Sequence, residues 1–243
     1  MDARGPASRA LPSGIALLAA FPTLLAIAAL LVAWRAPDLA LWPHLLEHVL
    51  PAALLRTIAL GAGVAAGTLL LGGALAALTS LCEFPLRRVL AVLLVLPLAI
   101  PAYVLAFVYI GVFDYGGTIA LAYRALTGGA SALPSLRNLP GAIVVLTLAL
   151  YPYVYLLARA ALARQGGALL EAARSQGLAP RAAMLRAVLP AIRPALVAGA
   201  SLALMESLAD FGAVAALGVD TLSTSVYKTW FGLGSLRAAA QLA

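Results

Sequence analysis

Two acidic side chains, Glu206 and Asp210, interrupt a stretch from 194 to 217 that is otherwise free of charge. Residues four apart share a face of an α-helix, so carboxylates at this spacing repel unless one is protonated, a cation bridges them or water solvates them. Hard cations prefer carboxylate oxygen, so the pair is suited to direct contact with a metal cation. The alternative is a role in helix packing or gating beside a wet cavity, and the sequence leaves both open.

A second group of possible ligands is the run His44-Leu45-Leu46-Glu47-His48. It matches the inverted zinc-peptidase pattern, in which two histidines on one helical face bind zinc and the glutamate acts as the base. Five residues match this pattern easily by chance, and we find no convincing third ligand. We favour an amphipathic helix at a membrane surface and keep a membrane-embedded zinc metallopeptidase as the alternative from another class. Metal ligands therefore stay unassigned.

The composition excludes an ordinary soluble protein. Of the 243 residues, 64% are hydrophobic and 10% are charged, and the net charge is +7. Soluble domains carry about 25% charged and 45–50% apolar residues, and a soluble fold cannot bury so much apolar surface. The sixteen Lys and Arg residues lie between apolar runs instead of on one polar face, which argues against a nucleic-acid partner. Lipid must cover part of this chain.

Five stretches are long enough to cross a bilayer, which requires about 20 apolar residues as a helix. The expected spans are about 14–34, 57–82, 89–113, 138–158 and 194–217. A helix satisfies its own backbone groups in lipid, and the Ala, Leu, Val and Ile content favours helices over a barrel. We expect an all-α membrane protein, a polytopic helical bundle of about five transmembrane helices that forms one domain over residues 1–243.

The basic residues predict the orientation, because Lys and Arg concentrate in short cytoplasmic loops. With the N-terminus inside, ten basic residues fall on the cytoplasmic side and six on the outer side. The cytoplasmic set comprises Arg4, Arg9, Arg87, Arg88, Arg159, Arg164, Arg174, Arg181, Arg186 and Arg193. We therefore expect a multi-pass protein of the bacterial inner membrane with a cytoplasmic N-terminus.

Glycines and prolines predict how the spans pack and bend. Gly63 and Gly67 have the small-residue spacing that lets membrane helices approach closely. Pro97 and Pro101 lie one turn apart in the third span, so their kinks should add on one face. This bend serves either plain bundle packing or a pathway beside the helix.

A polar stretch at about 164–193, between the fourth and fifth spans, predicts a helix–turn–helix on the cytoplasmic side. Residues 171–176 favour a helix and Gly177 is a natural residue for its C-terminal turn. Pro180 suits the first turn of the next helix, and Pro190 is expected to end that helix.

This stretch resembles the EAA loop of the membrane-spanning subunits of bacterial ATP-binding-cassette importers. The family pattern is an EAA triplet, a glycine four residues after it, and a Leu-Pro pair further on. The chain supplies it with Glu171, Ala172, Ala173, Gly177, Leu189 and Pro190, and departs from it at Ala187, where isoleucine is usual. The resemblance implies a type I importer permease fold and a loop that couples the permease to a cytoplasmic ATPase dimer.

Further segments resemble the ferric-iron importer permeases and their thiamine-permease relatives, with the ferric-iron type closest. They begin at Cys82, Leu96, Tyr151 and Asp210 and read CEFP, LPLAIPAYV, YPYVY and DFG. The resemblance implies a second permease half and an extracytoplasmic solute-binding protein as partners. No Walker-type phosphate loop occurs, so we expect no bound cofactor here and ATP use by the partner ATPase. Because those permeases hold two homologous halves in one chain, we expect this sequence to be an N-terminal half, truncated at its C-terminus.

Overall fold

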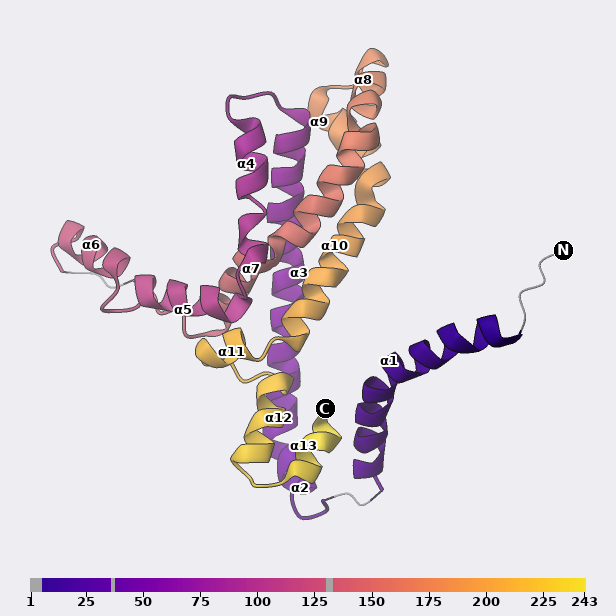
Figure 1. Ribbon diagram of the computed structural model, residues 1–243. Coiled ribbons are helices and arrows are strands. Elements are labelled where there is room, and N and C mark those ends of the chain that lie inside the picture. The colour runs from indigo at the N-terminus through magenta and orange to yellow at the C-terminus, as the bar shows by residue number, and fades with distance from the viewer. Residues whose placement is uncertain (1–5, 36–37, 130–132) are drawn as a thin grey trace. The chain divides into compact units, whose positions relative to one another are not determined.

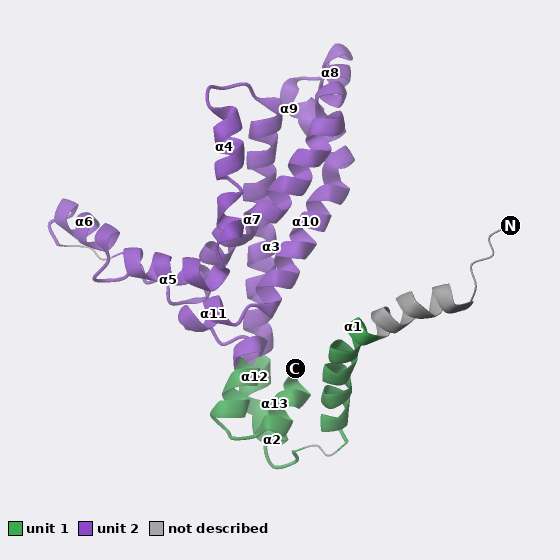
Figure 2. Ribbon diagram, viewed as in Figure 1, with its two compact units in different colours: residues 1–51, 225–243 green, residues 52–224 purple. Residues whose placement is uncertain are grey.

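The computed structural model describes residues 6–35, 38–129 and 133–243, and Arg4 of the orientation argument lies outside them. The chain divides into two compact units: Met1–Pro51 with Ser225–Ala243, and Ala52–Thr224 (Figure 2). All regular elements of the described residues are helices, so the expected all-α class is confirmed. Whether the chain works as one domain stays a prediction.

Among the described residues, four helices are long and apolar enough to cross a membrane: Trp42–Leu81, Ala102–Leu126, Leu139–Ser175 and Pro180–Ala209. A shorter apolar helix, Leu18–Ala33, belongs to α1 (Pro6–Ala33) and covers most of the first expected span. The second and fourth expected spans coincide with α3 (Leu50–Leu81) and α7 (Leu139–Ala161).

The smaller unit holds α1, α2 (Trp42–His44), the π-helical turn η1 (Leu45–Val49) and α13 (Leu236–Leu242), while α12 spans Leu222–Phe231. Buried Gln241 accepts a hydrogen bond from Trp42 Nε1 at 2.6 Å and donates one to the carbonyl of Ala33 at 2.8 Å. The hydroxyl of Ser235 donates to a carboxylate oxygen of Asp38 at 2.7 Å. These bonds join segments about 200 residues apart in the sequence.

In the larger unit, α3, α7 and α10 (Leu189–Ala209) pack against one another (Figure 1). A Cβ atom added at Gly63 would lie 2.6 Å from Ile143, and one at Gly67 would lie 2.5 Å from Thr147. The expected close approach of α3 at these two glycines is therefore confirmed. A Cβ atom at Gly199 of α10 would lie 2.6 Å from the Cα atom of Val154 in α7.

The glycine contacts also give the helix directions. Gly63, Gly67 and Gly72 of α3 meet progressively later residues of α7, so these two helices run parallel. By contrast, Gly61 meets Leu208 and Gly73 meets Leu196, so α10 runs antiparallel to α3. The relative directions expected for these three spans are confirmed, whereas the side of the membrane stays a prediction.

The prediction that the third expected span, 89–113, is one continuous helix is wrong. The structure has α4 (Arg87–Leu93), the 3₁₀ turn η2 (Leu96–Ala99) and then α5 (Ala102–Phe113). In Figure 1, α4 follows the bundle, whereas α5 turns away from it and leads to α6 (Thr118–Leu126).

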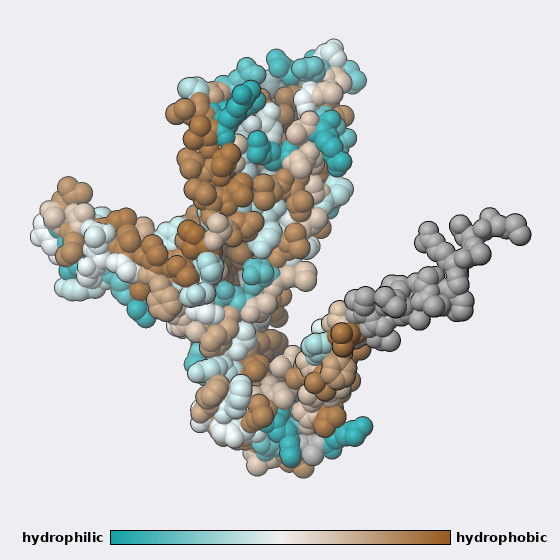
Figure 3. All heavy atoms as spheres, in the orientation of Figure 1, coloured by the Kyte–Doolittle hydropathy of each residue, from teal (hydrophilic) through white to brown (hydrophobic). Residues whose placement is uncertain are grey.

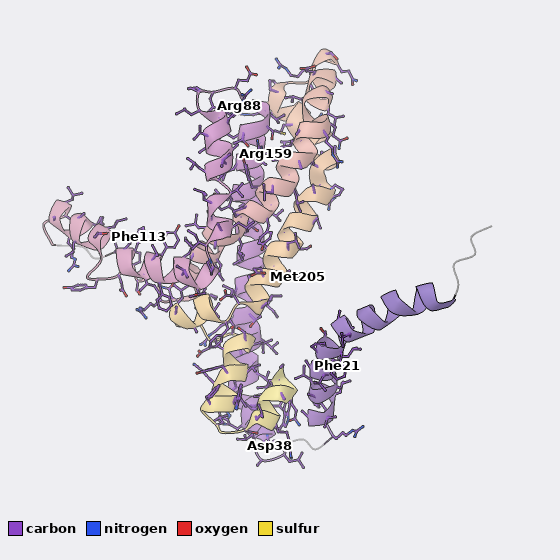
Figure 4. The ribbon with its side chains drawn as sticks, in the orientation of Figure 1. Phe21, Asp38, Arg88, Phe113, Arg159 and Met205 are labelled. Atoms are coloured by element: carbon purple, nitrogen blue, oxygen red, sulfur yellow. The ribbon has the colours of Figure 1, made fainter. Side chains whose placement is uncertain are left out.

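Hydrophobic and hydrophilic residues segregate along the larger unit. Figure 3 shows hydrophilic residues gathered at the end that carries α8 (Gly167–Ser175) and the start of α4, and a hydrophobic surface over the middle. Arg88 and Arg159 lie toward this end, and Met205 lies toward the opposite end (Figure 4). This distribution is expected where apolar residues contact lipid and charged residues contact water.

Candidate functional site

The segment that contains the EAA pattern, residues 164–193, forms a tight turn between two helices. After α8, Gly177 has a φ of +87°, a left-handed conformation that glycine adopts without steric cost. The amide of Gly177 donates to the carbonyl of Arg174 at 2.9 Å, and that of Leu178 donates to the carbonyl of Ala173 at 3.2 Å. These two bonds form a Schellman cap, so the expected C-terminal turn at Gly177 is confirmed.

Both arms of this segment continue the spanning helices. The first arm follows α7 through the π-helical turn η3 (Leu162–Gly166) into α8, and the second follows α9 (Pro180–Ala183) through the π-helical turn η4 (Met184–Val188) into α10. At about 1.5 Å per residue, the 37 residues Leu139–Ser175 extend about 55 Å, well beyond the roughly 30 Å of a hydrocarbon core. The last turns of this helix must therefore project from the membrane.

Pro190 does not end a helix, so that expectation was wrong. The amide of Leu189 donates to the carbonyl of Met184, five residues earlier, and this wider π-type bond directly precedes the proline. Proline lacks an amide hydrogen and its ring clashes with the carbonyl four residues earlier in a regular helix. A π-helical turn relieves this conflict by changing the bonding pattern, so the helix continues through Pro190.

The side chains of this segment divide between an inner and an outer face. Ala173 and Val188 are buried, and Val188 belongs to the same apolar cluster as Tyr155 and Leu162 of the bundle. The EAA triplet is split, because Ala173 faces inward whereas Glu171 and Ala172 are exposed. Leu189 and Pro190 are exposed as well. The buried face fixes the segment to the bundle and leaves the other face open.

The two prolines of the third span separate two helices instead of kinking one. Pro97 is the second residue of η2, and Ile100 is extended. Pro101 precedes α5, and its carbonyl accepts hydrogen bonds from the amides of Val104 and Leu105 in the first turn of that helix. The residue before a proline is biased toward extended conformations, which explains the break at Ile100. The expected addition of kinks on one helical face is therefore wrong, and a pathway role for Pro97 and Pro101 stays a proposal.

The acidic pair does not share a helical face, contrary to our expectation. Exposed Glu206 lies in α10, but that helix ends at Ala209 and Asp210 is extended. One carboxylate oxygen of Asp210 accepts hydrogen bonds from the amides of Ala213 at 2.7 Å and Val214 at 3.3 Å, at the start of α11 (Gly212–Ala216). Asp210 therefore caps a short helix where the fifth expected span, 194–217, is interrupted.

The possible zinc ligands remain two histidines and an exposed glutamate. The rings of His44 and His48 stack with centroids 5.1 Å apart, and His48 Nδ1 lies 4.0 Å from Glu47 Oε2. Within the described part of the chain, no group of three or more His, Cys, Asp or Glu side chains is placed to hold a metal ion. The geometry does not favour the metallopeptidase alternative.

Comparison with known proteins identifies the family. Residues 69–230 match the model of the binding-protein-dependent transport system inner membrane component. The chain belongs to this permease family. The matched region contains the whole segment with the EAA pattern, together with α7 and α10.

Two curated relatives of the permease are named for different solutes. PhnU of Salmonella choleraesuis, provisionally assigned to 2-aminoethylphosphonate transport, is 31% identical over 72% of this chain and 63% of its own length. The Fe(3+)-transport system permease protein FbpB 2 of Haemophilus influenzae is 28% identical over 72% of this chain and 31% of its own length. The chain thus spans less than two thirds of the curated relatives that it matches, and their names leave its solute open.

A solved structure shares the fold of the permease. A chain of a bacterial ABC transporter involved in the import of the acidic polysaccharide alginate superposes with a TM-score of 0.73 at 16% identity. The match covers 97% of this permease and 87% of the other chain. Because the identity is so low, the likeness concerns the fold alone.

Two features of the permease escaped the sequence analysis. Leu185 is 62% exposed in η4, on the outer face of the segment with the EAA pattern. Arg56 and Asp220, which are 164 residues apart, form an ion pair at the end of the larger unit opposite that segment. A leucine next to Arg186 in a polar stretch was a visible signal, whereas nothing local connects Arg56 with Asp220.

Proposed function

We propose that this chain is a membrane-spanning subunit of an ATP-driven importer and that α8 and α9 couple it to a cytoplasmic ATPase dimer. The observation that carries the proposal is the continuity of Leu139–Ser175 and Pro180–Ala209, which only four residues, 176–179, separate. A displacement of this turn must move α7 and α10 as rods, because each helix is continuous across the membrane. Rigid-body motion of packed helices is an established way to transmit a conformational change.

The exposed face of the turn is suited to a protein partner. Glu171 and Arg181 provide charges of opposite sign, and Leu185 provides an apolar side chain that the bundle does not cover. We infer that this face docks on the ATPase, which hydrolyses ATP while this chain binds no cofactor. A second permease half completes the pathway, to which Glu206, Asp210, Pro97 and Pro101 contribute, and an extracytoplasmic binding protein delivers the solute.

We infer the orientation from this docking. If the turn is cytoplasmic, then α7 begins at the outer side, and so does α3, because the two helices run parallel. Arg56 and Leu139 then lie at the outer end of the larger unit, and a crossing by the first expected span places the N-terminus in the cytoplasm. The family description supports placement in the inner membrane.

For the solute we keep two candidates, ferric iron and 2-aminoethylphosphonate, since relatives of both kinds match the same share of this chain. Asp210 uses one carboxylate oxygen as a helix cap, which weakens the case for a two-carboxylate iron contact with Glu206. Thiamine remains an alternative from the sequence resemblance only. The solute is best decided by transport assays.

The experiment is uptake of labelled ferric iron and 2-aminoethylphosphonate in cells that lack the complete gene and carry it back on a plasmid. The intact gene should restore uptake of one of these two solutes. Glu171→Lys should abolish it without loss of the protein from the membrane, because it reverses a charge on the docking face. Gly177→Trp should act likewise, since a side chain at a φ of +87° strains the turn.

Glu83→Lys is the matched control, because it reverses an exposed charge in the turn that joins α3 to α4, outside the proposed docking face. It should leave uptake within about twofold of the intact gene. Normal uptake with both Glu171→Lys and Gly177→Trp would contradict the coupling role. Zinc that co-purifies in stoichiometric amounts and is lost on His44→Ala would revive the peptidase alternative.

A further inference from the structure

A cavity of about 300 Å³ lies at the end of the larger unit opposite the turn at residues 176–179, which we call the coupling turn. Its walls are formed by Arg56, Leu139, Gly218, Val219 and Asp220. The volume falls at the lower limit of small-ligand sites, which are about 300–1,000 Å³. We propose that this cavity binds a small zwitterion, with its anionic group on Arg56 and its ammonium group on Asp220. The proposal rests on the importer function above and specifies the class of its solute.

The ion pair across the cavity is loose. One nitrogen of Arg56 lies 3.4 Å from one oxygen of Asp220, and both side chains are nearly half exposed. Charge-assisted hydrogen bonds are normally about 2.7–2.9 Å long, and exposed ion pairs contribute at most about 1 kcal/mol. A ligand that offers an anion to the guanidinium and a cation to the carboxylate can therefore replace this long contact between the two side chains.

The backbone that carries Asp220 is held firmly in place. Gly218 turns the chain with a φ of +69°, and the amide of Leu222 donates to the hydroxyl of Thr57 at 3.0 Å. That hydroxyl donates in turn to the carbonyl of Ala53 at 2.7 Å, one turn earlier in α3. Thr57 follows Arg56 directly, so the two charged residues belong to one hydrogen-bonded frame. A site with a fixed frame loses less entropy on binding.

The chemistry of the rim selects among solutes. A guanidinium binds phosphonate or carboxylate oxygens in a fork, and a carboxylate binds an ammonium group. A bare ferric ion has the same sign of charge as Arg56 and offers no anionic group to it, and a neutral solute offers no charge to either side chain. Of the solutes considered above, 2-aminoethylphosphonate carries both required groups.

The cavity lies at the start of the helix that leads to the coupling turn. Leu139 is the first residue of α7, the same helix that continues into α8 and the coupling turn. A bound solute would therefore contact one end of the rod whose other end docks on the ATPase. This arrangement links the presence of solute to the coupling turn without any intermediate element.

The test is calorimetric titration of the complete, detergent-solubilised importer, without its binding protein, with 2-aminoethylphosphonate and with ethylphosphonate, which lacks the amine. Arg56→Gln should weaken the binding of both compounds about tenfold or more, since it removes a charged contact. Asp220→Asn should weaken only the amine-bearing compound by a similar factor. Arg56→Lys keeps the charge and should retain most of the affinity.

A second ion pair provides the control. Arg137 Nε lies 3.1 Å from Asp114 Oδ2 with similar exposure, but neither residue lines this cavity. Arg137→Gln and Asp114→Asn should change neither affinity by more than about twofold. The proposal is overturned if the wild-type complex does not bind 2-aminoethylphosphonate, or if the cavity variants bind it as the controls do. A transported solute and a sensitivity to Glu171→Lys would still hold in that case, so the importer function is judged separately.

Discussion

The clearest structural prediction concerns two neighbouring glycines of α3, Gly72 and Gly73. A Cβ atom at Gly72 would lie 2.7 Å from the carbonyl oxygen of Tyr151 and 2.9 Å from Cβ of Val154, so it meets the backbone of α7. A Cβ atom at Gly73 would meet only a terminal methyl group of Leu196, at 3.4 Å. Flexible side-chain ends move easily, whereas a helix backbone does not.

The difference in stability follows from this geometry. Alanine is better than glycine in a helix by about 1 kcal/mol, and this gain applies to both substitutions. Gly72→Ala must also push α3 from α7 by roughly 0.7 Å to restore an ordinary contact of 3.4 Å, and overpacking of this kind costs about 1–3 kcal/mol. Because the helix gain cancels between the variants, Gly72→Ala should be about 1–3 kcal/mol less stable than Gly73→Ala.

The assay is thermal unfolding of the purified importer in detergent, followed by the loss of its monodisperse peak. A difference of 1 kcal/mol corresponds to about 2–4 °C for a domain of this size, so the two midpoints should differ by several degrees. Gly199→Ala should behave like Gly72→Ala, because its Cβ atom would also meet the backbone of α7. If Gly72→Ala were as stable as Gly73→Ala, the close backbone approach of α3 and α7 would be refuted.

Substitutions at three further positions test individual hydrogen bonds. Asp210→Ala should lower the free energy of unfolding by about 0.5–2 kcal/mol, measured by thermal unfolding. Asp210→Asn keeps an acceptor for the amides of α11 and should cost less. Equal losses for the two variants would argue against the cap. Tyr155→Phe should cost about 1 kcal/mol, because the buried hydroxyl bonds the carbonyl of Ala91 and the hydroxyl of Thr79, both at 3.3 Å. Gln241→Leu should speed hydrogen exchange in α13 and α2, since it leaves the indole of Trp42 unsatisfied, and unchanged exchange would contradict that bond.

Local sequence rules predict the structure where neighbouring residues alone decide the geometry. The turn at Gly177 was predictable because glycine after a helix favours a left-handed cap, and neighbouring residues decide that geometry. The close approach at Gly63 and Gly67 was predictable because small residues let helices meet. In contrast, the prediction that Pro190 ends a helix failed, because a proline rule does not include the π-helical turn that precedes it. The prediction that Glu206 and Asp210 share a helical face failed because α10 ends at Ala209, between the two residues.

The sequence by itself determined that this chain is a helical membrane protein. It also determined where the apolar stretches lie and which segment has the EAA pattern. The length of an apolar stretch and the spacing of a motif can both be read from the order of the residues alone. Only the tertiary structure decided that α3, α7 and α10 pack against one another, and that the turn at 176–179 joins two continuous rods. It also decided that Arg56 and Asp220, which are 164 residues apart in the sequence, meet at the rim of a cavity. These features depend on contacts between distant segments, and such contacts form only when helix packing fixes which faces and ends meet.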